Sequence, residues 1–219
     1  MTDVAVITPS LPRRHRLLAE AISSVAAQTI PVEHLIYSDE ILSVSEKRNR
    51  LIQCAGTEWV AFLDDDDLLD VRHIETLLEH ASNADVVIPH CRFQGPPLPS
   101  PACCEGFVNR PFNHADLKDH GIFAITVLAR RQSILDVGGF PSGDLEDWRL
   151  WKTLANAGAR FEVGPEVTWT YRTSGSDRRT RELFPPPPIL TVRRAKRALA
   201  RRAPQVYDWS RRRVRRQVG

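Results

Sequence analysis

Short apolar runs and helical repeats of apolar residues alternate along the first ninety residues of the chain. The runs are brief and rich in β-branched and aromatic residues, which predicts strands at residues 3–7, 34–37, 59–63 and 84–89. Between them, apolar residues recur at helical spacing, which predicts helices at residues 17–26, 43–54 and 71–78. Ser43 and Glu46 have the spacing of a capping box at the start of the second of these helices. This order predicts an α/β fold with a mostly parallel central sheet, right-handed crossovers and helices on both faces.

The second half of the chain carries further patterns of the same two kinds. A strand is predicted over residues 121–128, a short helix over 131–137 and a final extended segment over 160–171. Residues 143–148 are predicted to open another helix, with Leu150, Trp151 and Leu154 on its apolar face and its end at residues 156–158. No GxGxxG sequence follows the first strand, which argues against a dinucleotide-binding fold.

Polar residues follow each of the first three predicted strands. They are Thr8–Ser10 after the first strand, Asp39 after the second and Asp64–Asp67 after the third. Ligands of open parallel sheets bind beyond the carboxyl ends of the strands. The three polar segments are therefore expected to meet at one rim of the sheet.

The four consecutive aspartates are the most unusual of these segments. Adjacent carboxylates repel one another, so chain folding alone gives no reason to place four of them at the end of a buried strand. A hard divalent cation such as Mg²⁺ or Mn²⁺ gives a reason, because it binds carboxylate oxygens together with substrate phosphates. An acidic turn that caps the following helix is the alternative interpretation.

The composition is that of a soluble globular protein, with 219 residues, 42% hydrophobic and 26% charged. No apolar run approaches the roughly 20 residues that a membrane-spanning helix needs. The chain leads directly into a strand pattern without the features of a signal peptide, so a cytoplasmic location is expected.

The net charge of +3 conceals a strong asymmetry. Residues 189–219 carry a charge of +10, and the remainder of the chain carries −7. Four prolines, Pro185–Pro188, precede this basic segment and are predicted to form a stiff spacer. We therefore expect one domain over residues 1–184 and a basic C-terminal extension over residues 185–219.

Three interpretations of the basic extension remain open. Residues 191–203 have good helix formers but only a thin apolar stripe. The extension is either a solvated tail, a contact with an anionic membrane surface, or a contact with nucleic-acid phosphates. The membrane interpretation adds a peripheral location at the membrane to the cytoplasmic one.

The cysteines and histidines do not predict a zinc site. The four cysteines contain no CxxC pair, and their spacing to the histidines fits no known zinc pattern. Reduced thiols are therefore expected for Cys54, Cys91, Cys103 and Cys104.

In order and spacing, the motifs of residues 3–175 together resemble glycosyltransferase family 2. The matching segments are VAVITPS, SEKRNRLIQCAG, WVAFLDDDD, GGF, LEDWRLWKTLANAG and VTWTYRTS. The resemblance implies a single GT-A domain, a Rossmann-like fold. It also implies an inverting, hexosyltransferase-type enzyme that moves a sugar from a nucleotide-diphosphate sugar to an acceptor hydroxyl. A UDP-sugar is the expected donor, and the acceptor is a glycan, a lipid-linked molecule or a modified nucleic-acid base.

Carried over by position, the resemblance assigns the donor site to the predicted rim. It places the nucleotide base against Thr8, Pro9 and Asp39, with Ser10 beside them. Arg48 is expected to face the base or its phosphates.

The resemblance also implies a DxD motif within the run of aspartates. Asp64 is expected at the ribose with Asp65 beside it, and Asp66 at a Mn²⁺ or Mg²⁺ ion with Asp67 close by. The sequence does not establish the register of the motif among four identical residues.

The catalytic base is assigned to the LEDW segment in the same way. Asp147 matches the family's general base, and Glu146 is the second candidate. Both are also acids of a kind that stabilises the start of any helix. Trp148 is a candidate for stacking on a sugar ring.

One segment departs from the family pattern. Many members have a histidine after the YR of the last segment, where this chain has Ser174. Metal or phosphate contacts from that side are then expected from Arg172, Arg178 or Arg179.

Two other classes remain as alternatives. A nucleotidyltransferase of related fold would also hold a metal with aspartates at the rim, although ITPSLPRRH lacks the glycines expected of a triphosphate loop. A nucleic-acid-binding protein with a degenerate transferase fold would show salt-sensitive binding through the basic extension and no sugar transfer.

Overall fold

The computed structural model describes residues 3–95, 112–119 and 124–173. Several predicted features lie outside them. These are the proline spacer, the helix at 191–203, residues Cys103 and Cys104, and the side chains Ser174, Arg178 and Arg179.

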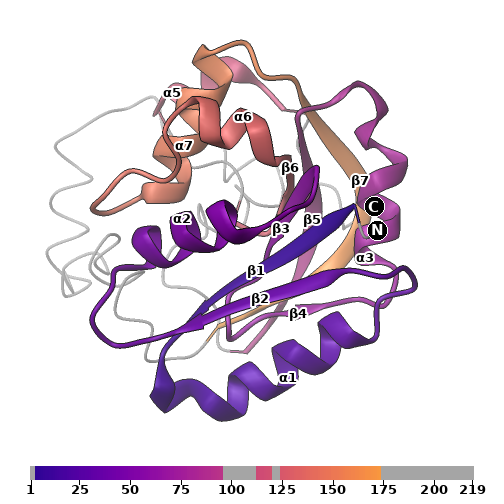
Figure 1. The fold of residues 1–219 in the computed structure, drawn as a ribbon. Helices are drawn as coiled ribbons and strands as arrows, with labels where there is room; N and C mark the ends of the chain where they lie inside the picture. Colours follow the sequence, from indigo (N-terminus) through magenta and orange to yellow (C-terminus); the bar gives the residue numbers. More distant parts are fainter. Residues whose placement is uncertain (1–2, 96–111, 120–123, 174–219) are drawn as a thin grey trace, which may run out of the picture. The chain divides into compact units, whose positions relative to one another are not determined.

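The described residues form a seven-stranded sheet, shown in Figure 1. Its strands lie in the order β2-β1-β3-β6-β5-β7-β4. Their bounds are β1 (Val4–Ser10), β2 (Glu33–Ser38), β3 (Trp59–Phe62), β4 (Leu68–Leu69), β5 (Val86–Gln94), β6 (Leu128–Arg130) and β7 (Phe161–Arg172).

Five of these strands run in the same direction. β1 pairs in parallel with both β2 and β3, and β5 pairs in parallel with β7. β6 lies between β3 and β5 and is antiparallel to both, while β4 is antiparallel to β7. The predicted mostly parallel sheet is therefore confirmed, with two short strands reversed.

The helices cover both faces of the sheet, as predicted. They are α1 (His15–Ala26), α2 (Val44–Cys54), α3 (His73–Glu79), α5 (His114–Asp119), α6 (Arg131–Asp136) and α7 (Glu146–Asn156), with short 3₁₀ turns at Pro12–Arg14 (η1) and Ala81–Asn83 (η2). Apolar residues of α2, α5, α6 and α7 pack in one core cluster, and those of α1 and α3 pack in the other. In Figure 1, α2, α6 and α7 lie on one side of the sheet and α1 lies on the other.

The sequence of β1 begins with a continuous apolar run because both faces of the strand are buried. Ala5 and Ile7 belong to the core cluster beneath α2 and α7, whereas Val4 and Val6 belong to the cluster beneath α1 and α3. A strand that is buried on both faces needs apolar side chains at successive positions rather than at alternate ones.

The structure corrects the predicted strand at residues 121–128. The strand of this region, β6, begins at Leu128, and residues 124–127 precede it without strand structure. Val127 and Leu128 are nevertheless fully buried. Burial in the core therefore gave this segment its strand-like apolar pattern.

The start of α2 agrees with its predicted capping box. The Ser43 hydroxyl accepts a hydrogen bond from the backbone N–H of Glu46, and the Glu46 carboxylate accepts one from the N–H of Ser43. This pair satisfies amides that a helix start otherwise leaves without partners. It orients α2, whose buried face contacts the rim described next.

Two smaller findings complete the fold. Cys54 is exposed and Cys91 is buried. No helix in the described part of the chain is long and apolar enough to cross a membrane.

Candidate functional site

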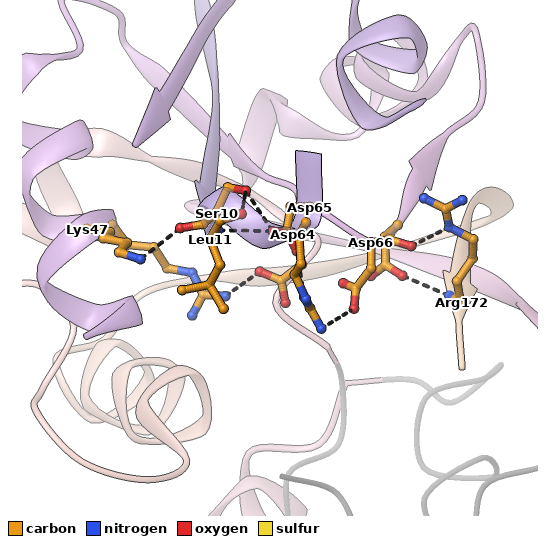
Figure 2. Close-up of polar contacts among 10 residues, drawn as sticks. Ser10, Leu11, Lys47, Asp64, Asp65, Asp66 and Arg172 are labelled. Atoms are coloured by element: carbon orange, nitrogen blue, oxygen red, sulfur yellow. Dashed lines mark hydrogen bonds and ion pairs between the residues drawn. The ribbon is translucent and has the colours of Figure 1, made fainter. Parts of the chain in front are cut away.

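The ends of β1 and β2 and the start of α2 are tied together by the buried side chain of Lys47. Its ammonium group donates a hydrogen bond of 2.8 Å to the carbonyl oxygen of Ser10 and another to the carbonyl oxygen of Asp39. Figure 2 shows the first of these contacts. Lys47 was not singled out from the sequence, although it lies in the KRN segment. Its burial beside Arg48 makes this part of α2 the support of the rim.

The first two polar segments differ in exposure. Thr8 is fully buried, and its hydroxyl lies 3.0 Å from Nε2 of His34, whose pKa is lowered to about 4 by burial. Pro9 is also buried within β1. The Asp39 side chain is partly exposed, and its carboxylate accepts hydrogen bonds from the N–H groups of Leu42 and Ile41, which lower its pKa.

The four aspartates alternate between partly exposed and buried positions. The side chains of Asp64 and Asp66 are 36% and 25% exposed, whereas that of Asp65 is 4% exposed and Asp67 is buried. A turn closed by the 3.2 Å hydrogen bond from Asp67 N–H to the Asp64 carbonyl follows β3. The alternation gives the four identical residues different environments.

The two buried carboxylates are engaged within the protein. Asp65 accepts hydrogen bonds from the Ser10 hydroxyl at 2.7 Å and from Nη1 of Arg14 at 2.6 Å. Asp67 accepts the backbone N–H of Arg172 at 2.8 Å. These contacts, drawn in Figure 2, connect β1 and β7 to the turn after β3.

The partly exposed carboxylates each face an arginine. Asp64 forms an ion pair with Nη2 of Arg48 at 2.6 Å, and Asp66 forms one with Nη2 of Arg14 at 3.0 Å. Burial, followed by the charge of Asp64, raises the pKa of Asp66 to about 6. Burial and the charge of Asp66 also raise the pKa of Asp67 well above its ordinary value. A cation at this turn would relieve the repulsion among the carboxylates.

Arg48 joins the turn of aspartates to the start of α7. Its guanidinium is only 3% exposed and donates from Nη2 to Asp64 and from Nη1 to Glu146, the latter at 2.9 Å. The ring of Phe140 lies 5.3 Å from the guanidinium carbon. Arg48 was expected to face the nucleotide. In the structure it spans the carboxylates of Asp64 and Glu146, which are 82 positions apart in the chain.

The two acids at the start of α7 have different surroundings. Glu146 is buried against Arg48, whereas Asp147 is half-buried and accepts the backbone N–H of Trp148 at 2.7 Å. Burial and the neighbouring charge of Glu146 raise the pKa of Asp147. Leu145 immediately before them has φ of 55°, a left-handed conformation that is strained for a residue with a side chain.

The two tryptophans of α7 have separate roles in packing. Trp148 is half-buried, and its indole N–H donates to the carbonyl oxygen of Leu117 at 2.7 Å, while Lys152 lies over its ring. Trp151 is fully buried in the core, as its helical position predicts. The Trp148 ring is therefore already held by α5 and α7.

A second contact of α2 fixes the glycine-containing segment that precedes α7. The Asn49 side chain accepts the N–H of Phe140 at 2.7 Å and donates to the Phe140 carbonyl at 2.9 Å. Gly139 has φ of 79°, and a Cβ there would lie 2.5 Å from the Asn49 oxygen. A side chain at position 139 would therefore have to displace Asn49. The side chain of Asn49 was not predicted to take part.

Arg172 closes the opposite side of the turn. Its Nε donates to the carbonyl oxygen of Asp66, and its Nη1 pairs with Glu20. It therefore supports the aspartate turn from β7, the side on which the sequence led us to expect additional positive charge.

The carboxylates at the turn fit a metal that takes few protein ligands. In the described part of the chain, no group of three or more histidine, cysteine, aspartate or glutamate side chains converges on a point. Mg²⁺ and related hard ions commonly bind through one or two carboxylates and complete their coordination with substrate phosphates and water. The partly exposed Asp64 and Asp66 match that donor set.

Comparisons with known proteins agree with this geometry. Residues 34–100 match the model of glycosyl transferase family 2. No curated protein matches the chain in sequence. The resemblance stated from the motifs is confirmed by the family match.

Solved structures share the fold at low sequence identity. S. aureus TarS 1–349 in complex with UDP has a TM-score of 0.60 and 19% identity, over 80% of this chain and 61% of that one. Its complex with UDP-GlcNAc has a TM-score of 0.58 and 18% identity, over 80% and 59%. Mannosyltransferase PcManGT from Pyrobaculum calidifontis, in complex with GDP-Man and Mn²⁺, has a TM-score of 0.59 and 18% identity, over 83% and 59%.

The match spans about three fifths of the length of these chains. At these identities they establish the fold alone, and the predicted GT-A fold class is confirmed.

Proposed function

Because a segment of the chain matches glycosyl transferase family 2 and the described domain has the GT-A fold, we propose that the protein is an inverting glycosyltransferase. It would move a sugar from a nucleotide-diphosphate sugar to an acceptor hydroxyl. One observation carries the proposal. The aspartate turn after β3 is joined through Arg48 to the start of α7, where Asp147 is half-buried with a raised pKa.

The donor would bind along the rim made by β1, β2 and the turn. The partly exposed Asp39 carboxylate would be available to a nucleobase or ribose, and Asp64 is the partly exposed carboxylate that pairs with Arg48 of α2. Thr8, Pro9 and Ser10 would form the floor of this site, since they are buried at the end of β1. The structures solved with UDP, UDP-GlcNAc and GDP-Man make uridine and guanosine donors the first to test.

Exposure favours Asp64 and Asp66 as the outer members of the DxD motif. Asp66 would bind Mn²⁺ or Mg²⁺, with Asp64 beside it. Asp65 and Asp67 would hold the turn, because Asp65 is engaged by Ser10 and Arg14, and Asp67 by the Arg172 amide. Asp67, which we expected close to the metal from the sequence, is thus proposed to hold the turn. When bound, the ion would neutralise charge on the leaving diphosphate.

Asp147 is the proposed general base. Its carboxylate would accept the proton of the acceptor hydroxyl while that oxygen bonds to the anomeric carbon and the bond to the diphosphate breaks. The raised pKa makes Asp147 a stronger proton acceptor than an ordinary aspartate. Glu146 is less suited to this role because its carboxylate is buried against Arg48. Trp148 remains a predicted sugar-stacking residue.

Thermal-shift measurements with nucleotide-diphosphate sugars, in Mn²⁺ or in EDTA, test the donor assignment. A ligand that binds the native state raises the melting temperature in proportion to its affinity and concentration. We expect one uridine or guanosine donor to stabilise the protein only when Mn²⁺ is present. If no donor stabilises it under either condition, the proposed function is wrong and nucleic-acid binding by the extension becomes the leading idea.

Two variants test the base. Asp147→Asn should keep the donor-dependent thermal shift and lose release of the nucleotide diphosphate from the donor. Asp144→Asn is the matched control, because Asp144 is exposed and precedes α7 by two positions. If Asp147→Asn releases nucleotide as fast as wild type, the assigned base is wrong.

The basic extension lies outside the described residues. Its charge of +10 would favour an acceptor attached to an anionic lipid surface or to nucleic acid.

A further inference from the structure

Arg14 holds two consecutive aspartates of the turn with one guanidinium group. Nη1 lies 2.6 Å from Oδ1 of Asp65, and Nη2 lies 3.0 Å from Oδ2 of Asp66. Arg14 comes from η1, between β1 and α1, and its side chain is 35% exposed. A positive group from a distant loop therefore already lies on the carboxylate to which we assign the metal.

The two halves of this contact differ in how firmly they are held. Asp65 is almost fully buried and is also fixed by the Ser10 hydroxyl at 2.7 Å. Asp66 is partly exposed, so its side chain and Nη2 of Arg14 meet nearer to solvent. The outer contact can therefore open while the inner contact keeps the guanidinium beside the turn.

A divalent cation and Nη2 of Arg14 would compete for Asp66. Both are positive, and a metal ion at the carboxylate would repel the guanidinium across a few ångströms. A diphosphate has the opposite effect, because its oxygens attract both the metal and the arginine, and guanidinium groups bind phosphate oxygens well.

We propose that Arg14 is a built-in competitor of the divalent cation at Asp66 and becomes a diphosphate-binding residue when metal and donor bind together. The inference rests on the proposed function, since it takes Asp66 as the metal-binding carboxylate. Metal alone binds weakly because it must displace Arg14. Metal with a nucleotide diphosphate binds more tightly because the displaced guanidinium gains an anionic partner. The two ligands are therefore positively coupled through Arg14.

Mn²⁺ binding measured by electron paramagnetic resonance of the free ion tests this directly, with no need for turnover. Arg14→Gln should bind Mn²⁺ alone about fivefold more tightly than wild type, the factor expected for removing one partly exposed ion pair. The same variant should show a smaller gain in Mn²⁺ affinity on addition of UDP or GDP. Arg14→Lys keeps the charge but lacks the planar guanidinium that spans two carboxylates. Its affinity for Mn²⁺ should therefore lie between that of wild type and that of Arg14→Gln.

Arg13→Gln is the matched control. This variant removes the same charge at the neighbouring position. The Arg13 side chain is exposed and forms no ion pair with any of the described residues. The variant should bind Mn²⁺ as wild type does. Thermal melts of each variant verify that the fold is retained.

The outcomes separate this inference from the proposed function. If Asp66→Asn loses Mn²⁺ binding but Arg14→Gln binds it no more tightly than Arg13→Gln, the role of Arg14 is wrong and the metal assignment stands. If nucleotide raises Mn²⁺ affinity equally in wild type and Arg14→Gln, the coupling through Arg14 is also wrong. If neither wild type nor Arg14→Gln binds Mn²⁺ with either nucleotide, the proposed metal dependence is wrong and the inference with it.

Discussion

Replacing Glu146 with alanine tests the buried connection between the aspartate turn and α7. The change removes the carboxylate that accepts Nη1 of Arg48 at 2.9 Å. The guanidinium is 3% exposed, and its Nε already has no hydrogen-bond partner among the residues that the structure describes. Asp64 remains on Nη2, so the variant keeps one of the two carboxylates beside the buried charge.

The expected loss follows from the burial of both partners. Removing one partner of a buried ion pair costs about 3–5 kcal/mol, because the remaining charge is left without compensation. Asp64 still compensates part of the charge of Arg48, so we expect the lower end, about 3 kcal/mol. For a domain of this size that is a fall of about 6–12 °C in melting temperature. Glu146→Gln keeps an acceptor oxygen and should lose about 1–2 kcal/mol.

Urea-induced unfolding of Glu146→Ala, Arg48→Met and the double variant measures the coupling between the two side chains. The double variant should be less destabilised than the sum of the two single variants, by about 1.5 kcal/mol or more. Glu58→Ala is the matched control, because Glu58 pairs with Arg130 but is 61% exposed, and its change should be too small to resolve.

One result would refute the reasoning. If Glu146→Ala loses less than about 1 kcal/mol and the coupling is below about 0.5 kcal/mol, then Arg48 is not held between two carboxylates in solution. The connection that carries the proposed function would then be absent.

Three further predictions concern the same site. Gly138→Ala should lower the free energy of unfolding in urea by about 1 kcal/mol, because position 138 has φ of 87° and open space where the new Cβ would lie. Gly139→Ala should lower it by at least about 1 kcal/mol more, because its Cβ would displace Asn49. The folded-state pKa of Asp66, about 6, lies above its ordinary value of 3.8, so this group destabilises the metal-free fold increasingly as pH rises from about 4 to about 6. Thermal melts in EDTA should therefore show Asp66→Asn more stable than wild type by about 1–2 kcal/mol at pH 7, and equally stable near pH 3. Lys47→Met leaves two carbonyl oxygens without their buried donor, and it should lose about 1–2 kcal/mol and speed amide hydrogen exchange at the ends of β1 and β2. Equal losses for the two glycine variants, no pH-dependent difference for Asp66→Asn, or unchanged exchange for Lys47→Met would each contradict the corresponding contact.

Local sequence patterns determined much of the fold. The strands and helices of the first ninety residues are periodic because each has to bury one stripe or both faces against the sheet. The capping box at Ser43 and Glu46 is a contact within one turn, so spacing alone predicted it. Strand β4 was missed because two residues are too few to show a period, and β6 was placed too early because buried coil is as apolar as a strand.

The candidate site, like the fold, was predictable from the sequence only in part. The run Asp64–Asp67 was predictable because charged residues that follow an apolar strand stand out in the sequence, whereas Asp147 was assigned because it matches a motif of the family that the chain resembles. Their individual environments were not predictable, because four identical aspartates differ only in what approaches them from elsewhere in the chain. Arg14, Arg48 and Arg172 reach the turn from three separate elements and contact different carboxylates. Those contacts join residues up to 105 positions apart, and only tertiary packing decides which of them form.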